Sequence, residues 1–433
     1  MPSKARPTPA GKSKSKRPTA RGGASAPGFS GIDEILAEIR AGRMVIVTDD
    51  EDRENEGDLI CAAESITPEM VNFMVRAGGG MLCAPIDGDT ARRLELASMV
   101  AQNDEPFRTH FTVTVDAKKG LTTGISTVER AQTIRQLAAE KSRPADFVRP
   151  GHISPLIAKP GGVLRRAGHT EAAVDLARLA GKRPAGALIE ILDANGIPAR
   201  LPALQKFARK HRLKMCSIAQ LIEYRRVREK LVQREQVVQM PTDFGEFDLY
   251  LYRSLIDDQN HLALVKGKID DGEPALVRVH SECLTGDVFA SRRCDCGSQL
   301  HTAMQRVQEA GRGVILYMRQ EGRGIGLAAK IHAYKLQEQG YDTVEANLKL
   351  GFPMDLRDYG VGAQILHDLG VRKIRLMTNN PRKLVGLSGH SLEVVEQVPL
   401  LTQPNPHNKK YLETKRRKMG HLLAGSRNRN GSS

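Results

Sequence analysis

Three cysteines lie close together in the second half of the sequence, at Cys283, Cys294 and Cys296. The segment Arg278–Gly297 reads RVHSECLTGDVFASRRCDCG, so ten residues separate the first two thiols and one separates the last two. Clustered thiolates are typical of Zn²⁺ sites, and three protein ligands leave the fourth tetrahedral position open for water. A structural zinc site closed by a remote histidine is the alternative that the spacing leaves open.

Carboxylates crowd a segment in the first half of the sequence. Asp49–Asp58 reads DDEDRENEGD, in which seven of ten residues are acidic. The segment follows the apolar run Met44–Thr48, which predicts a short strand, and loops after strands often carry catalytic residues. Because clustered carboxylates repel one another, a packed cluster favours a hard cation such as Mg²⁺ or Mn²⁺. A solvated loop without function is the alternative interpretation.

A Gly-His-Thr turn follows much later, in the sequence RRAGHTEA at residues 165–172. The run 172–180 predicts a helix, for which Thr170 is the expected N-cap. The free N–H groups at a helix N-terminus attract phosphate, and Arg166 adds a bidentate donor for phosphate oxygens. We therefore interpret His169 as part of a site and not as an isolated structural histidine.

The DEDRENEGD loop and the GHTEA turn together resemble 3,4-dihydroxy-2-butanone 4-phosphate synthase. The resemblance implies conversion of D-ribulose 5-phosphate to L-3,4-dihydroxy-2-butanone 4-phosphate and formate. It implies that Glu54 and His169 hold Mg²⁺ or Mn²⁺, and that His152 and Glu190 are catalytic. The residues that it places against the sugar phosphate are Arg53, Glu54, Asp58, Arg166, Thr170 and Glu190.

The motifs RVHSECLTGD, RCDCG, RQEGRGIGL and TNNPRK together resemble GTP cyclohydrolase II. The resemblance implies that Cys283, Cys294 and Cys296 bind zinc. The implied reaction opens the imidazole ring of GTP and releases formate, pyrophosphate and 2,5-diamino-6-(5-phosphoribosylamino)pyrimidin-4(3H)-one. The positions that match the family's GTP-binding residues are Arg278, Val279, His280, Ser281, Glu282, Gln299, Glu321, Gly322, Arg323, Thr343, Thr378 and Lys383.

Asp355 and Arg357, in GFPMDLRDYG, match the catalytic pair of that family, and Tyr334 matches a position near the zinc-bound water. The family pattern makes Arg357 a nucleophile on the α-phosphate. A guanidinium keeps its proton, with a pKa above ~12, so a second interpretation is that Arg357 clamps the phosphates while Asp355 orients it or takes a proton.

Strands and helices must bring these distant residues together. The apolar spacing of residues 32–39 predicts a helix, with Ser30 as its cap and Asp33 three residues on. Thr67–Pro68 predicts the start of another helix, with proline in its first turn. Residues 219–236 predict a charged helix, and we expect the domain boundary near its end.

Further on, Pro241–Gly245 predicts a turn before the strand Glu246–Arg253. Gln299–Ala310 predicts a helix and Gly313–Arg319 a strand. We therefore expect an α+β protein with two mixed α/β catalytic domains in tandem and disordered basic termini. The expected segments are a tail at 1–27, the two domains at 28–234 and 235–421, and a tail at 422–433.

The net charge of +15 is concentrated at the two ends of the chain. Residues 1–27 and 409–433 each contribute +7, so residues 28–408 carry only +1. We interpret the ends as tails that expose their charge to solvent, with contact to RNA or an acidic partner as the alternative. The near-neutral body, the 4% aromatic content and the lack of Trp argue against a nucleic-acid-binding zinc protein, which would need stacking surfaces.

The remaining expectations concern the setting of the protein. No run of about 18 apolar residues predicts a membrane span, and no apolar stretch follows the basic start as in a secretory signal. We expect a cytoplasmic homodimer that acts on small molecules, with a plastid transit peptide as the alternative interpretation of residues 1–27. The residues Ala77, Gly79, His110 and Glu129 differ from those usual in the first family, so an inactive first half that serves as a scaffold is the rival interpretation.

Overall fold

The computed structural model describes residues 28–51, 53–352, 357, 359–380, 392–401 and 403–419. Two predicted site residues, Asp355 and Lys383, lie outside these ranges, as do the expected tails at 1–27 and 422–433. Among the described helices, none combines the length and the apolar character that crossing a membrane would require.

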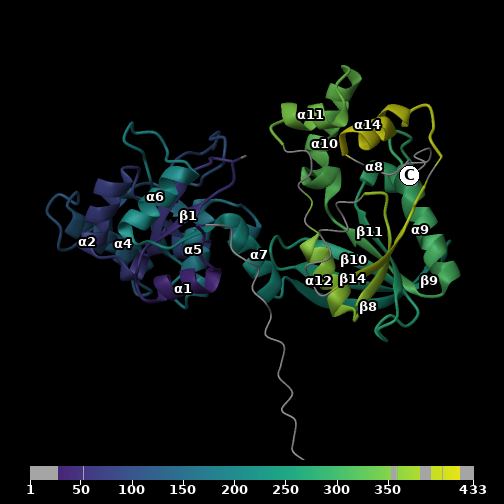
Figure 1. Cartoon of the computed structure of the whole chain (residues 1–433), viewed down its shortest axis with the longest axis horizontal. Coiled ribbons are helices and arrows are strands. Elements are labelled where there is room, and N and C mark those ends of the chain that lie inside the picture. Colours follow the sequence, from purple (N-terminus) through teal and green to yellow (C-terminus); the bar gives the residue numbers. More distant parts are fainter. Residues whose placement is uncertain are drawn as a thin grey trace, which may run out of the picture.

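The described residues form two α/β domains, each built on a mixed sheet, which confirms the expected fold class. Figure 1 shows the first domain in purple to teal and the second in green to yellow, with helix α7 between them. The first sheet has the strand order β4-β5-β3-β6-β2-β1-β7. Its strands are β1 (Val45–Thr48), β2 (Gly57–Ala62), β3 (Cys83–Ile86), β4 (Val115–Ala117), β5 (Phe147–Ile157), β6 (Gly186–Glu190) and β7 (Met215–Ser217).

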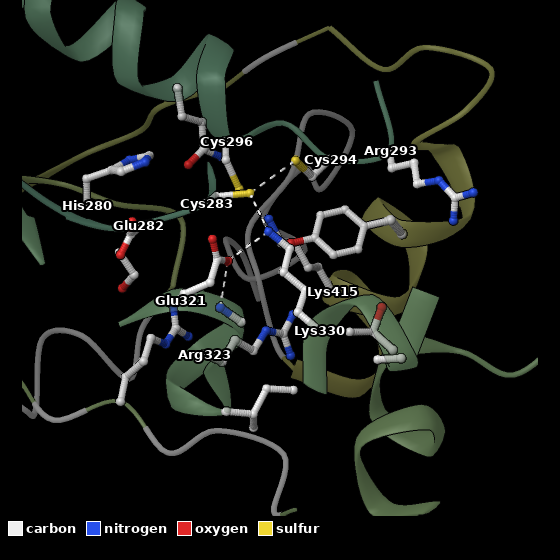
Figure 2. A pocket seen from close by; sticks show the side chains of 18 of the residues that line it. His280, Glu282, Cys283, Arg293, Cys294, Cys296, Glu321, Arg323, Lys330 and Lys415 are labelled. Carbon is white, nitrogen blue, oxygen red and sulfur yellow. Dashed lines mark hydrogen bonds and ion pairs between the residues drawn. The ribbon is translucent and has the colours of Figure 1, made fainter. Parts of the chain in front are cut away.

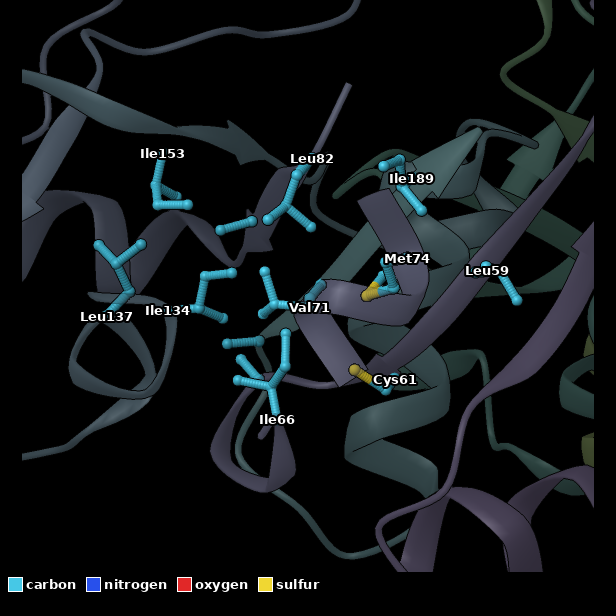
Figure 3. Close-up of a cluster of buried hydrophobic side chains, with 14 of the residues drawn as sticks. Leu59, Cys61, Ile66, Val71, Met74, Leu82, Ile134, Leu137, Ile153 and Ile189 are labelled. Atoms are coloured by element: carbon cyan, nitrogen blue, oxygen red, sulfur yellow. The ribbon is translucent and has the colours of Figure 1, made fainter. Parts of the chain in front are cut away.

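Helices cover both faces of the first sheet. Side chains of a strand point alternately to its two faces, so apolar runs such as β1 and β2 are buried on both sides. In Figure 3, Val71 and Ile134 from two helices pack with Leu59 and Ile189 of the sheet. The helices of this domain are α1 (Ile32–Arg40), α2 (Pro68–Phe73), α3 (Gly88–Arg93), α4 (Thr127–Ala138), α5 (His169–Leu179), α6 (Leu201–His211) and α7 (Ile218–Arg228).

The second sheet is antiparallel at one end and parallel at the other, in the order β14-β13-β11-β12-β10-β9-β8. Its strands are β8 (Val232–Thr242), β9 (Gly245–Ser254), β10 (Asn260–Lys266), β11 (Ala275–Ser281), β12 (Gly313–Met318), β13 (Lys373–Met377) and β14 (Glu393–Val398). The helices are α8 (Leu284–Asp287), α9 (Cys296–Ala310), α10 (Gly326–Glu338), α11 (Thr343–Lys349), α12 (Gly360–Asp368) and α14 (Lys409–Met419).

Two local predictions are wrong. Helix α1 begins after Gly31, and Ser30 instead donates its backbone N–H to the Met215 carbonyl, so the sheet has captured the residue expected to cap the helix. The charged helix expected over 219–236 ends at Arg228, and β8 follows from Val232. Pairing of β8 with β9 through a long antiparallel ladder overrides the helical propensity of these charged residues.

Helix α7 is fastened to both domains. On one side Arg225 donates to Asp175 at 2.6 Å and to the Gly161 carbonyl at 2.8 Å. On the other side Gln364 of α12 accepts a hydrogen bond from the backbone of Leu231 and donates to the carbonyls of Arg226 and Glu229. The passage from one domain to the other is therefore held by buried polar contacts.

Arg225→Met should lower the free energy of unfolding of the first domain by about 3–5 kcal/mol, because it leaves the buried Asp175 carboxylate without its cation. Urea denaturation measures the change. Arg228→Met, on the same helix, removes an ion pair with Asp33 in which both side chains are exposed, so it should cost less than about 1 kcal/mol. Equal shifts of the two variants would contradict this account of α7.

Candidate active sites

The acidic loop folds around Asp49, which lies between the end of β1 and the start of β2. Its carboxylate accepts hydrogen bonds from the backbone N–H groups of Glu54 and Glu56, at 3.0 and 2.9 Å, and from Arg53 Nη1 at 2.9 Å. These bonds curl the loop back toward the sheet. The acidic run predicted a cluster, and the structure identifies Asp49 as the residue that shapes it.

His169 reaches this cluster from the first turn of α5. Its Nδ1 lies 3.8 Å from Glu54 Oε2 and 4.0 Å from Asp58 Oδ1, and its Nε2 lies 3.2 Å from the Val47 carbonyl. Potential ligand atoms of Asp49, Glu54 and His169 all lie within 4.8 Å of one another, and so do those of Glu56, Asp58 and His169. The donor set of carboxylates and one imidazole fits a hard divalent cation.

Protons take the place of a cation in the electrostatics of this cluster. Burial raises the pKa of Glu56 to about 7 and that of Asp58 to about 8. Burial alone would lower the pKa of His169, but Asp58, Glu54 and Asp49 raise it to about 9. Carboxyl groups with raised pKa values next to an imidazole are suited to general acid–base chemistry.

The start of α5 differs from the prediction by one residue. Gly168 is the N-cap, in an extended conformation, so Thr170 is buried in the first turn instead of capping the helix. Arg166 donates to Glu171 Oε2 at 2.6 Å, to Thr109 Oγ1 at 2.7 Å and to a backbone carbonyl. The basic side chain is thus held in place beside the helix N-terminus.

Glu190 and His152 lie on different strands. Glu190 ends β6 directly opposite Asp58 of β2, and its Oε2 accepts a hydrogen bond from the Met81 backbone at 2.7 Å. His152 lies on β5, and among the described residues its hydrogen bonds run to Asp116, with Nδ1 2.6 Å from Oδ2. Sequence reasoning missed Asp116, because an isolated acid 36 residues away carries no motif.

Two of the departures from the first family have structural roles. Gly79 has φ +90° and ends the π-helix Met74–Gly78, a conformation that favours glycine. Glu129 forms a capping box with Ser126 at the start of α4. His110 Nε2 lies 2.7 Å from Ser98 Oγ. Nothing in the structure explains Ala77.

The second site lies where the parallel strands of the second sheet end. The carboxyl ends of β11, β12 and β13 meet at one edge, which is where open α/β sheets bind ligands. A cavity of about 1100 Å³ opens there (Figure 2). The predicted residues that line it are Arg278, His280, Ser281, Glu282, Cys283, Cys294, Cys296, Gln299, Glu321, Gly322, Arg323, Tyr334, Thr343, Arg357 and Thr378. Val279 packs its side chain into the core instead.

The three cysteines converge on one wall of this cavity. Cys283 precedes α8 and Cys296 begins α9, and the sulfur atoms of all three lie within 4.8 Å of one another. Hydrogen bonds from Cys294 and Cys296, with the nearby Lys330 ammonium, hold the pKa of Cys283 far below its usual value. A Cβ on Gly286 would lie 2.8 Å from Cys294 Sγ, so only glycine allows the thiols to close up. This donor set fits zinc.

Glu321 connects the thiols to the Gly-rich turn. Its carboxylate accepts from the backbone of Leu284 at 2.7 Å, from the backbone of Gly322 at 2.8 Å and from Lys330 Nζ at 2.8 Å. Lys330 Nζ also lies 3.2 Å from Cys283 Sγ. Arg323 has φ +65°, a strained conformation that is found mostly at functional sites.

Arg278 begins a chain of buried side chains behind the cavity. It donates to the Met377 carbonyl at 2.9 Å and to Gln299 Oε1 at 2.5 Å, and Gln299 donates to Asp295 at 2.6 Å. The cavity residues that sequence reasoning missed include Lys330, Asn379, Asn380, Tyr411 and Lys415. None of these side chains is distinguished in the sequence, since each gains its place from a distant contact.

Residues 33–224 match the family model described as 3,4-dihydroxy-2-butanone 4-phosphate synthase, and residues 233–399 match that of GTP cyclohydrolase II. The riboflavin biosynthesis protein RibBA of Bacillus cereus is 59% identical over 395 residues, which are 91% of this chain and 99% of that protein. A bifunctional, chloroplastic riboflavin biosynthesis protein of Arabidopsis thaliana is 57% identical over 92% of this chain and 74% of its own length. A solved two-domain 3,4-dihydroxy-2-butanone 4-phosphate synthase from A. baumannii is 40% identical, with a TM-score of 0.68, over 85% of this chain and 99% of that chain.

Divalent cations should bind the acidic cluster more tightly as the pH rises. Glu56 is protonated below about 7, Asp58 below about 8, and His169 is cationic below about 9, so a cation must displace protons to bind. Calorimetric titration of the full chain with Mn²⁺ should show binding at least ~10-fold tighter at about pH 9 than at about pH 6, with proton release. An affinity independent of pH would refute these assignments.

Proposed function

This chain belongs to the riboflavin-biosynthesis proteins that join a 3,4-dihydroxy-2-butanone 4-phosphate synthase to a GTP cyclohydrolase II, and we propose that each half catalyses its own reaction. The first half converts D-ribulose 5-phosphate to L-3,4-dihydroxy-2-butanone 4-phosphate and formate. The second converts GTP to a diaminopyrimidinone ribosyl phosphate, formate and pyrophosphate. The observation that supports this most directly is that each domain presents its own cluster of ligand side chains.

In the first half, the reaction moves protons next to a carbonyl or an enediol. A divalent ion, when bound by Glu54 and His169, would acidify those protons and stabilise the enediolate charge. Glu190, beside the raised-pKa carboxyl of Asp58, is placed to exchange protons with the substrate. Asp116 holds the His152 ring by Nδ1, which leaves Nε2 for proton transfer.

The phosphate of the sugar fits the start of α5. Free backbone N–H groups at a helix N-terminus and the helix dipole favour an anion, and Thr170 lies in that turn. Arg166, fixed by Glu171, adds a cation on the same side, and Arg53 adds another at the acidic loop. We assign these three residues to phosphate and hydroxyl recognition.

In the second half, Cys283, Cys294 and Cys296 hold zinc, which would supply Lewis acidity at the wall of the cavity. The cationic side chains of Arg278, Arg323 and Lys330 balance the charge of a triphosphate. Arg357 Cζ lies 5.7 Å from the centre of the Tyr359 ring, so its guanidinium is held at the cavity. We assign Arg357 to clamping the phosphates, because a guanidinium keeps its proton and is a weak nucleophile.

The wider setting follows the same proposal. We assign residues 28–234 to the synthase and residues 235–421 to the cyclohydrolase. The first site takes Mg²⁺ or Mn²⁺, and the protein acts in the cytoplasm as a homodimer on small molecules, without nucleic acid or membrane as partner. Support comes from the near-neutral charge of residues 28–408, which gives the body no basic surface excess.

The double variant Cys294→Ser, Cys296→Ser should lose its zinc and its release of formate from GTP, by more than ~100-fold, because two of three thiolate ligands are gone. Formate release from ribulose 5-phosphate should stay within about twofold, since those residues lie in the other domain. Elemental analysis and a formate assay measure both effects. Cys216→Ala, a buried cysteine of the first domain, is the control and should keep its zinc. Zinc retained by the double variant would refute the metal site.

Glu54→Ala should abolish metal-dependent formate release from ribulose 5-phosphate, by more than ~100-fold, because the cation loses a carboxylate ligand. Glu190→Ala should also be inactive but should still bind Mn²⁺, which calorimetry can measure. Glu51→Ala removes an exposed acid of the same loop and should leave activity within about twofold. If the wild-type protein converts GTP but not ribulose 5-phosphate, the scaffold interpretation of the first half is correct.

A further inference from the structure

Helix α14 lies after residue 399, where the match to the GTP cyclohydrolase II family model ends. The charge distribution predicted that the basic segment 409–433 exposes its charge to solvent. The described part of that segment differs, because Lys415 is buried, with 8% of its surface exposed. Leu412, on the same helix, is buried as well, and Figure 1 shows α14 beside α8, α10 and α11. The helix is therefore packed onto the domain.

One face of α14 forms part of the wall of the GTP cavity. Tyr411 and Lys415 are one helical turn apart, so their side chains lie on the same face, and both line the cavity. Lys415 appears in Figure 2 among the side chains around the thiols. Before the helix, Asn408 Nδ2 lies 3.5 Å from the carbonyl of Cys294. The segment thus contacts the cysteine turn at two points.

Lys415 makes a buried ion pair with the residue between two of the thiols. Its Nζ donates to Asp295 Oδ1 at 2.8 Å, and the side chains are 10% and 2% exposed. The other oxygen of Asp295 accepts from Gln299, which in turn accepts from Arg278. Without Lys415, a buried carboxylate would stand uncompensated beside Cys294 and Cys296, and the support of Arg278 would loosen.

We propose that α14 is a wall of the GTP site and that Lys415 is a positioning residue, which fixes the cysteine turn and the Arg278 guanidinium through Asp295. This inference rests on the function proposed for the second half. It assigns to the C-terminal helix a role in holding both the metal ligands and a nucleotide-binding cation. Lys415 acts through Asp295, so its effect on GTP is indirect.

The test uses Lys415→Met in the full chain, with two readouts. The rate at which EDTA removes zinc should rise at least ~10-fold, because the turn that carries two ligands is no longer held, and kcat/KM for GTP should fall at least ~10-fold. Formate release from ribulose 5-phosphate should stay within about twofold, which checks that the chain is folded. Arg417→Met is the matched control, because Arg417 is exposed on the same helix and pairs only with Glu413 among the contacts described.

A double variant separates the charge effect from simple loss of packing. If Lys415 compensates Asp295, then Lys415→Met combined with Asp295→Asn should release zinc more slowly than Lys415→Met alone, because the unpaired carboxylate has been removed. Equal zinc loss in the single and double variants, or zinc loss unchanged in Lys415→Met, would overturn the inference. Should the wild-type protein fail to turn over GTP, the proposed function would fall, while zinc release would still report whether Lys415 holds the cysteine turn.

Discussion

Anionic side chains that are brought together away from water repel one another, and both domains are arranged around that repulsion. In the first, the four carboxyl groups of Asp49, Glu54, Glu56 and Asp58 surround a single imidazole. In the second, three thiols and two carboxylates share a cavity wall with buried lysines. Each cluster is held by backbone donors and by cations on neighbouring elements, so the surrounding fold supplies the energy that keeps the ligands together.

The two domains meet this constraint differently. The acidic loop relies on protons and on the helix α5, since burial keeps Glu56 and Asp58 easy to protonate and the carboxylates keep His169 charged. The thiols rely on fixed positive charge, because Lys330 lies against Cys283 and the Glu321 carboxylate in turn holds Lys330. A hard cation suits the first arrangement and a thiophilic ion the second, which explains why one chain carries two kinds of metal chemistry.

Residues in motifs could be predicted from the sequence, because local spacing alone identifies them. The acidic run, the Gly-His-Thr turn and the close pair of thiols all report their chemistry without knowledge of the fold. Asp116 and Lys415 could not be found in this way, since each matters only through a partner that lies far away in the chain. The error over residues 229–236 has the same origin, because a strand partner decides between two conformations that the local charge pattern permits equally.

The way α7 passes into the second sheet limits how such a protein can be taken apart. Leu231 and Val232, directly after the helix, are core residues of the second domain, while Arg225 belongs by its contacts to the first. The glutamine of α12 that holds the end of α7 would face an empty place if the second half stood alone. Exchange of halves between relatives by recombination would therefore succeed only where the incoming partner brings a matching join, so the fusion point itself is inherited as a unit.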